Sequence, residues 1–153
     1  MADTVLLQTK FLVPRIGESH LSRPAQVAQI CNAKTIPCTL LIAPAGYGKT
    51  SLLTELADVY NGSLAWVQLD EGDNDPATFM AYLVESVRRQ NRDLLPPGIF
   101  QTDDNIAPNR MLVILLNQLL ANPDQRWLLI LDDYHIIHNP VVHQLMTTLL
   151  DNV

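Results

Sequence analysis

The amino-acid sequence predicts an α/β fold built on a parallel sheet. Short apolar runs of the kind found in buried strands alternate along the chain with segments of helical periodicity. The run at 127–131 is unbroken, which is typical of a strand covered on both faces. Helices that join such strands in right-handed crossovers would cover the sheet on both sides, so we expect three layers, helix, sheet and helix.

The first half of the chain is expected to contain two helices and two strands. Between 49 and 59, four apolar residues recur at helical spacing and are expected to face the core: Leu52, Leu53, Leu56 and Val59. The polar residues Thr54, Glu55 and Asp58 are expected on the opposite face. The elements expected, in order, are an extended lead-in at 1–22, a helix at 24–33, a strand at 39–42, a helix at 49–59 and a strand at 64–69.

In the second half, helix starts are marked by capping residues. Asp75 is followed by proline, and Asn139 is also followed by proline, which is the preferred order of an N-cap and a first helical residue. Asn109 is expected to cap the helix between them. The remaining expected elements are a helix from Pro76, an irregular loop at 91–108, a helix ending before Asn122 and Pro123, a strand at 127–131 and a final helix from Pro140.

Residues 43–50, Ala-Pro-Ala-Gly-Tyr-Gly-Lys-Thr, match the pattern of a phosphate-binding loop, with Ala43 in the place of its first glycine. Gly46 and Gly48 would let backbone N–H groups approach phosphate oxygens closely. The strand expected before the loop and the helix expected after it supply the order that this motif requires. We therefore predict that the loop binds a nucleoside triphosphate.

Each side chain of the loop has an expected role. Lys49 would lie between the β- and γ-phosphates, the Thr50 hydroxyl would bind Mg²⁺, and Ser51 could donate to the α-phosphate. Pro44 has no N–H to donate. The alternative is a glycine turn that caps an ordinary helix and leaves Lys49 solvated. The predicted nucleotide-binding segment comprises Pro44, Ala45, Gly46, Tyr47, Gly48, Lys49, Thr50 and Ser51.

Two acidic residues follow the apolar strand at 127–131. A carboxylate at the carboxyl end of a buried parallel strand lies at the sheet edge where ligands bind. Asp132 is therefore predicted to hold Mg²⁺, and Asp133 is the candidate catalytic residue that orients or activates a water molecule. Two acids in a solvated turn are the alternative.

The acidic turn from Asp70 to Asp75 also follows a strand end. Such a turn could face a ligand, but Asp and Asn are also favoured in turns and helix caps. We favour the capping interpretation and keep Asp70 as a secondary candidate for the site.

Composition narrows the function classes. The chain has 153 residues, a hydrophobic content of 48% and a net charge of −6, as expected for a globular domain. Its ten basic residues are scattered, so no DNA-contacting surface is expected. The N-terminus has no signal-peptide order and no apolar run reaches membrane-spanning length, so a cytoplasmic location without membrane contact is expected.

Three separated motifs together resemble the MalT-like, large ATP-binding LuxR-type transcriptional regulators. They are Ala-Gly-Tyr-Gly-Lys-Thr, Trp-Val-Gln-Leu-Asp-Glu-Gly-Asp-Asn and Leu-Asp-Asp-Tyr-His-x-Ile-x-Asn-Pro, and the resemblance runs from Lys10 to the final helix. It implies a P-loop NTPase domain of the STAND type, which switches between an ADP state and an ATP state that self-associates. By the same resemblance Arg23 corresponds to an arginine that contacts the nucleotide, although the acidic residues usual after it are absent.

The resemblance also carries expectations about domain organisation. Residues 23–153 would form a partial P-loop NTPase domain after the lead-in at 1–22. The family's fourth strand lies between the phosphate-loop strand and the Asp132 strand, and the chain ends where that strand should begin. We therefore expect an incomplete sheet with unpaired strand edges, and a fragment or truncated product of marginal stability. Sensor and DNA-binding domains of the family would lie beyond it.

Two other functions remain open from the sequence. A stand-alone ATPase or kinase would use the same loop, but would also need an acceptor site or a lid. An interaction module with a vestigial loop would bind no nucleotide. If the regulatory interpretation holds, any ATP hydrolysis would be slow and would reset the switch.

Overall fold

The computed structural model describes residues 6–18, 20–32, 39, 41, 44, 46–91, 107–121 and 124–153. Two compact units make up the chain. One comprises Met1–Leu12 together with Ser63–Val153, and the other is the intervening stretch Val13–Gly62. The 13–62 unit is thus inserted into the chain of the larger unit.

Two helices form the described part of the 13–62 unit. They are α1 (Pro24–Asn32) and α2 (Lys49–Val59), which pack against each other. Both begin where the sequence predicts. The strand expected at 39–42 lies largely outside the described residues.

The buried face of α2 differs from the prediction. Leu52 and Leu56 are buried as expected, but so are Thr54 and Glu55, which were predicted to face outward. Val59 is 60% exposed, although it continues the apolar spacing. Apolar spacing alone does not predict the buried face of α2. Thr54 and Glu55 can be buried because both have hydrogen-bond partners within the same unit.

The larger unit is built on a parallel pair of strands, β1 (Ser63–Gln68) and β2 (Trp127–Asp132). Their register aligns Ser63 with Trp127 and Gln68 with Asp132, so both strands end at the same edge. The two strands predicted at 64–69 and 127–131 are confirmed within one residue. The parallel α/β arrangement is also confirmed for this pair.

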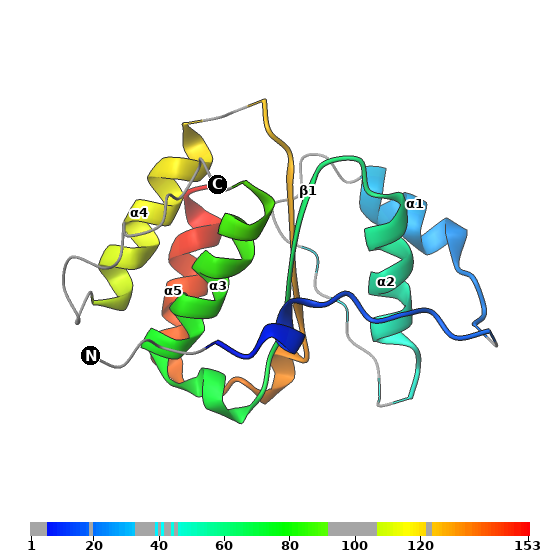
Figure 1. Cartoon of the computed structure of the whole chain (residues 1–153), viewed down its shortest axis with the longest axis horizontal. Helices are drawn as coiled ribbons and strands as arrows, with labels where there is room; N and C mark the ends of the chain where they lie inside the picture. Colours follow the sequence, from blue (N-terminus) through cyan, green and yellow to red (C-terminus); the bar gives the residue numbers. More distant parts are fainter. Residues whose placement is uncertain are drawn as a thin grey trace. The chain divides into compact units, whose positions relative to one another are not determined.

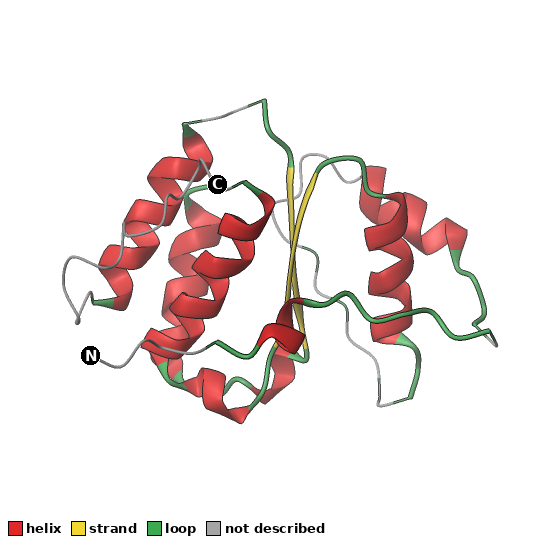
Figure 2. Cartoon of the chain, in the orientation of Figure 1, coloured by secondary structure: helices red, strands yellow, loops and turns green. Residues whose placement is uncertain are grey.

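Three helices pack on one face of the strand pair: α3 (Pro76–Gln90), α4 (Pro108–Leu120) and α5 (Pro140–Asp151). They lie side by side in Figures 1 and 2. Ala65 and Val67 point from β1 into the core, where they meet fully buried residues of the helices. The helical members buried most deeply are Phe79, Met80, Leu83, Leu112, Leu115 and Val142. No helix of the described residues is long and apolar enough to cross a membrane.

Proline and its preceding residue set the start of each of these helices. The predicted N-caps Asp75 and Asn139 are confirmed, because their side chains accept hydrogen bonds from Thr78 N and Val141 N. The cap predicted at Asn109 is wrong. Helix α4 begins at Pro108, two residues earlier than a cap at Asn109 would give, because proline fixes the backbone angle that a first helical residue needs. Most of the loop expected at 91–108 lies outside the described residues.

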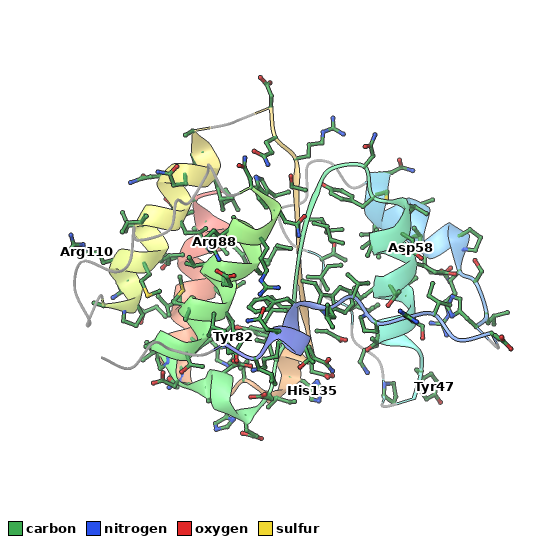
Figure 3. All side chains as sticks on the ribbon, in the orientation of Figure 1. Tyr47, Asp58, Tyr82, Arg88, Arg110 and His135 are labelled. Atoms are coloured by element: carbon green, nitrogen blue, oxygen red, sulfur yellow. The ribbon has the colours of Figure 1, made fainter. Side chains whose placement is uncertain are left out.

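The lead-in is more ordered than the sequence predicted. A short 3₁₀ helix, η1 (Gln8–Phe11), packs on β1 and α3. Lys10 is buried to 7% exposure, and its Nζ lies 2.6 Å from Asp73 Oδ2 and 3.0 Å from Asp70 Oδ2. The same ammonium lies 4.2 Å from the centre of the Tyr82 ring, which is labelled beside η1 in Figure 3. This lysine therefore fastens the start of the chain to the larger unit.

The ion pairs of Lys10 shift the pKa values of the residues that form them. Burial alone would lower the pKa of Lys10, but its hydrogen bonds to Asp73 and Asp70 and their negative charges hold the pKa above its ordinary value. The hydrogen bond from Lys10, aided by one from Gly72 N, lowers the pKa of Asp70. Both groups therefore stay charged at neutral pH.

We predict that Lys10→Met lowers the free energy of unfolding by about 3 kcal/mol, because it leaves the fully buried carboxylate of Asp73 without its cation. Urea denaturation followed by circular dichroism measures the change. Arg110→Met is the matched control, since Arg110 is exposed on α4 and its removal should change stability by less than about 0.5 kcal/mol. Equal losses in the two variants would show that the buried pair has no special role.

Candidate functional site

The phosphate loop leads directly into the first turn of α2. Gly46 and Gly48 have φ angles of 82° and 72°, in the left-handed region that favours glycine. Gly48 is also the N-cap of α2, and it has no side chain to occupy the helix terminus. Backbone N–H groups at such a terminus attract anions, both as donors and through the helix dipole. The local backbone is therefore of the kind that receives a phosphate.

Lys49 bends back over its own loop. Its Nζ donates a hydrogen bond to the Pro44 carbonyl, at 3.1 Å, and Tyr47 N donates to the same carbonyl, at 3.4 Å. The ammonium is thereby held beside the loop instead of extending into solvent. Tyr47 is 65% exposed and projects outward, as labelled in Figure 3.

Arg23, which the family resemblance brought into the site, lies against the loop. The position that a Cβ would take at Gly48 is 3.1 Å from Arg23 Nη2. The left-handed backbone favours glycine at 48, and a Cβ there would also press against the Arg23 guanidinium. The Arg23 guanidinium therefore lies beside Gly48, and a second cation, Lys49, is the next residue of the chain.

A carboxylate on α2 holds the backbone of Arg23. Both oxygens of Glu55 accept from Arg23 N, at 2.9 and 3.2 Å, and His20 Nε2 lies 2.6 Å from Glu55 Oε1. The Arg23 N–H, more than any other group, lowers the pKa of Glu55, and hydrogen bonds from Ser22 and His20 add to the effect. Glu55 is therefore a charged anchor within the 13–62 unit.

The predicted acidic pair lies at the end of β2. Asp132 is the last residue of the strand and is 3% exposed, and its Oδ1 accepts from Asp133 N at 3.0 Å. Asp133 has φ 60° and ψ 29°, a left-handed conformation that Asp tolerates better than most residues. It begins the short 3₁₀ helix η3 (Tyr134–Ile136). The chain thus turns sharply after Asp132 and leaves the Asp133 side chain one-third exposed.

The acidic turn after β1 is held to the segment after β2. Asn74 Oδ1 accepts from His138 N and Asn139 N, at 2.8 and 3.1 Å, and Asn74 Nδ2 donates to Ile136 O at 3.2 Å. In return, Asn139 Nδ2 donates to Asn74 O at 2.8 Å. These bonds fix the path of the chain after Asp133.

The favoured interpretation of Asp70 is confirmed. Its carboxylate accepts from Gly72 N, at 2.9 Å, and Asp73 Oδ2 accepts from Asp70 N, at 2.7 Å, so the two acids cap the 3₁₀ helix η2 (Glu71–Asn74) reciprocally. Asp70 also forms the ion pair with Lys10. The Asp70 carboxylate therefore stabilises the fold of the larger unit.

The structure brings the predicted residues together in two groups. Arg23, Pro44 and 46–51 belong to the 13–62 unit, whereas Asp132 and Asp133 belong to the larger unit. Ala45 and Ala43 lie outside the described residues. Within the described residues, no group of His, Cys, Asp or Glu forms a ready-made cluster of three metal ligands.

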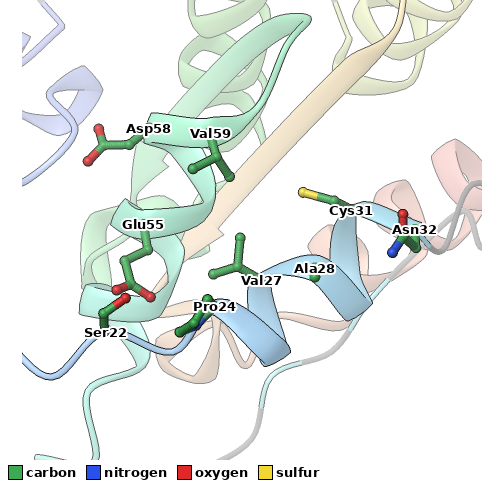
Figure 4. Close-up of a pocket in the computed structure, with 9 residues that line it drawn as sticks. All are labelled: Ser22, Pro24, Val27, Ala28, Cys31, Asn32, Glu55, Asp58 and Val59. Atoms are coloured by element: carbon green, nitrogen blue, oxygen red, sulfur yellow. The ribbon is translucent and has the colours of Figure 1, made fainter.

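A cavity of about 500 Å³ lies between α1 and α2. Figure 4 shows Val27, Cys31 and Val59 around its apolar part and the Glu55 and Asp58 carboxylates on the α2 side. None of the described residues of the loop lines it. The Glu55 carboxylate already accepts hydrogen bonds from Arg23 N and His20, so its charge is compensated within the protein.

Three residues that shape these groups were not found from the sequence. The sequence pattern places Glu55 on a solvated helix face, Lys10 in an irregular lead-in and Asn74 in an ordinary turn. Asn74 does occur in one of the three motifs that carry the family resemblance, and Lys10 lies where that resemblance begins. Their partners are distant in sequence, so the spacing of residues carried no signal of the contacts.

The parallel strands with their helices, and the glycine loop opening α2, are compatible with part of a P-loop NTPase domain. No model of a protein family matches the chain. Curated relatives do. The HTH-type transcriptional regulator MalT of Cronobacter sakazakii is 33% identical over 148 residues, which is 93% of this chain and 16% of that protein.

The MalT regulators of two Klebsiella pneumoniae strains are each 31% identical over 144 residues, again 93% of this chain and 16% of the relative. The chain is therefore MalT-like, a homologue of HTH-type transcriptional regulators along nearly its whole length. It spans about a sixth of the length of the curated relatives that it matches.

We predict that Gly48→Ala destabilises the 13–62 unit more than Gly46→Ala does. Both substitutions place a Cβ in a left-handed backbone, at a cost of about 1–2 kcal/mol. Only the Cβ at 48 would also lie 3.1 Å from a guanidinium, since nothing lies within 4 Å of a Cβ at 46. Urea unfolding of the two variants measures the difference.

Arg23→Ala provides the control for this comparison. Without the guanidinium, Gly48→Ala should cost no more than Gly46→Ala. A cost for Gly48→Ala that is unchanged by Arg23→Ala would contradict the contact between Arg23 and the loop.

Proposed function

We propose that this chain is the ATP-binding switch module of a MalT-like transcriptional regulator. The observation that carries the proposal is the local structure of the loop, in which two left-handed glycines lead into a helix and the Lys49 ammonium folds back onto the Pro44 carbonyl. The homology to MalT regulators supports the regulatory part of the proposal.

Lys49 is the main phosphate ligand in this proposal. Its ammonium now donates to the neutral carbonyl of Pro44. A phosphate oxygen is a stronger acceptor because it is charged, so exchange of one acceptor for the other favours binding. Residues 44–51 would surround the phosphates, and the guanidinium of Arg23 would add a second cation beside Gly48.

Each unit also has an oxygen ligand of the type that Mg²⁺ prefers, the Thr50 hydroxyl in the 13–62 unit and the Asp132 carboxylate in the larger unit. The ion would neutralise phosphate charge when bound. Asp132 is buried at a strand end and fixed by Asp133 N. Asp133 is partly exposed and would act on a water molecule as a general base, giving slow hydrolysis.

ATP would act through binding energy more than through turnover. A nucleotide shifts a conformational equilibrium by the difference of its affinities for the two states. ATP would favour a state that self-associates in the longer protein, and ADP would favour the other. We assign no DNA contact and no membrane contact to this segment, and place it in the cytoplasm.

Lys49→Ala should weaken the binding of ATP with Mg²⁺ by about 100-fold or more, because it removes a charge-assisted hydrogen bond to phosphate. Isothermal titration calorimetry on the 153-residue chain measures the affinity. Arg110→Ala is the charge-matched control and should bind as the parent does. Equal affinities in all three proteins would overturn the assignment of the loop, and absence of heat from the parent would favour a vestigial loop.

Asp133→Asn should slow ATP hydrolysis by about 100-fold, the lower range for a lost general base, and leave ATP affinity unchanged. Single-turnover release of phosphate, followed alongside a binding titration, separates the two effects. Unchanged hydrolysis would remove Asp133 from the catalytic role. Rapid steady-state turnover by the parent chain would instead favour a stand-alone ATPase.

A further inference from the structure

Glu55 has a set of partners that ordinary burial of a helix residue does not require. It is 9% exposed, and its carboxylate accepts hydrogen bonds from the Arg23 backbone, the Ser22 side chain and His20. All three donors belong to the short segment that precedes α1. An ionised carboxylate makes stronger hydrogen bonds than a neutral acceptor does, so one residue of α2 fixes this segment.

The fixed segment ends at the residue that reaches the loop. Arg23 N is held by Glu55, whereas the Arg23 O accepts from Gln26 N and Val27 N at the start of α1. Its backbone is therefore restrained on both sides. From this point the side chain extends until Nη2 lies 3.1 Å from the Cβ position of Gly48.

Both anchoring points belong to the same helix. Gly48 caps α2, and Glu55 lies about two turns further along it. Helix α2 therefore holds the Arg23 backbone with one residue and receives the Arg23 guanidinium at its own N-terminus. A shift of the segment would move the guanidinium away from the loop.

We propose that Glu55 is a positioning residue of the nucleotide site, which holds Arg23 so that its guanidinium stays beside the phosphate loop. The inference rests on the proposed nucleotide binding. Glu55 touches no nucleotide in this account, and it acts only through Arg23. Its contribution to affinity should therefore disappear when the guanidinium is absent.

A double-mutant cycle tests this dependence. The cycle uses the parent chain, Glu55→Ala, Arg23→Ala and the double variant, with ATP and Mg²⁺ titrated by calorimetry. Arg23→Ala retains the backbone N–H that Glu55 binds and removes only the guanidinium. We expect Glu55→Ala to weaken binding about tenfold in the parent, and to have no effect on affinity in the Arg23→Ala background.

Two further variants separate positioning from general damage. Asp58→Ala removes an exposed carboxylate from the same helix and should leave the affinity unchanged. Glu55→Gln keeps the length but has one acceptor oxygen in place of two and no charge, so it should lose part of the affinity. Glu55→Asp keeps the charge but withdraws it from Arg23 N, and should behave as Glu55→Ala does. If circular dichroism shows that Glu55→Ala is unfolded, the cycle is run with Glu55→Asp.

The outcomes distinguish the positioning role of Glu55 from the nucleotide binding on which it rests. An equal loss of affinity in both Arg23 backgrounds, or no loss in either, would overturn the positioning role while nucleotide binding stands. A folded parent chain that binds no ATP would overturn both. A loss confined to the background with Arg23 supports the proposal.

Discussion

Parallel pairing of β1 with β2 is the constraint on which the larger unit depends. Strands that run in the same direction cannot be joined by a tight turn, so the chain must return over one face of the pair. Helices α3 and α4 occupy that return, and α5 continues the layer after β2. The same pairing places both strand ends at one edge, so the turn at 70–75 and the acids at 132–133 are neighbours.

That edge is then fixed by polar contacts instead of apolar ones. Asn74 binds the last residue of η3 and the segment after it with both ends of its amide, and Asp73 binds the ammonium of Lys10. The Lys10–Asp73 pair is buried, and a buried polar group that loses its partner keeps its desolvation penalty. This edge of the larger unit should therefore tolerate little change at Asp73 and Lys10.

In the 13–62 unit the corresponding role belongs to α2. Its N-terminus faces the loop, and its interior carries the Glu55 carboxylate that holds Arg23. One helix thus bears both the anion-attracting terminus and the anchor of a nearby cation. The phosphate loop and the segment before α1 are separated in sequence but share this single support.

Local patterns in the sequence predicted the elements of the fold well. Apolar runs located β1 and β2, and Asp75 and Asn139 preceded helices as capping chemistry requires. The cap at Asn109 failed because the proline before it had a stronger effect than the amide. Among the candidate site residues, the sequence indicated the loop, Asp132 and Asp133 by motif, but not their supports.

Those supports escaped prediction for a physical reason. Lys10 pairs with Asp73 and Glu55 with Arg23 across long stretches of chain, and a charged residue that will be buried looks the same in sequence as one that will be solvated. The left-handed conformation of Asp133 was equally invisible, since Asp is tolerated there but does not demand it. Which charged residues form pairs is determined by the folded structure.

The contacts of η1 have one more consequence, which concerns the stretch from Val13 to Gly62. Both of its ends continue into the larger unit, one held there by Lys10 and the other entering β1 directly. The stretch is thus a closed loop in the sense of polymer physics. The entropy lost on closing such a loop rises only with the logarithm of its length, so insertions or deletions within it cost little free energy of closure. The larger unit can therefore accept an inserted stretch of varied length.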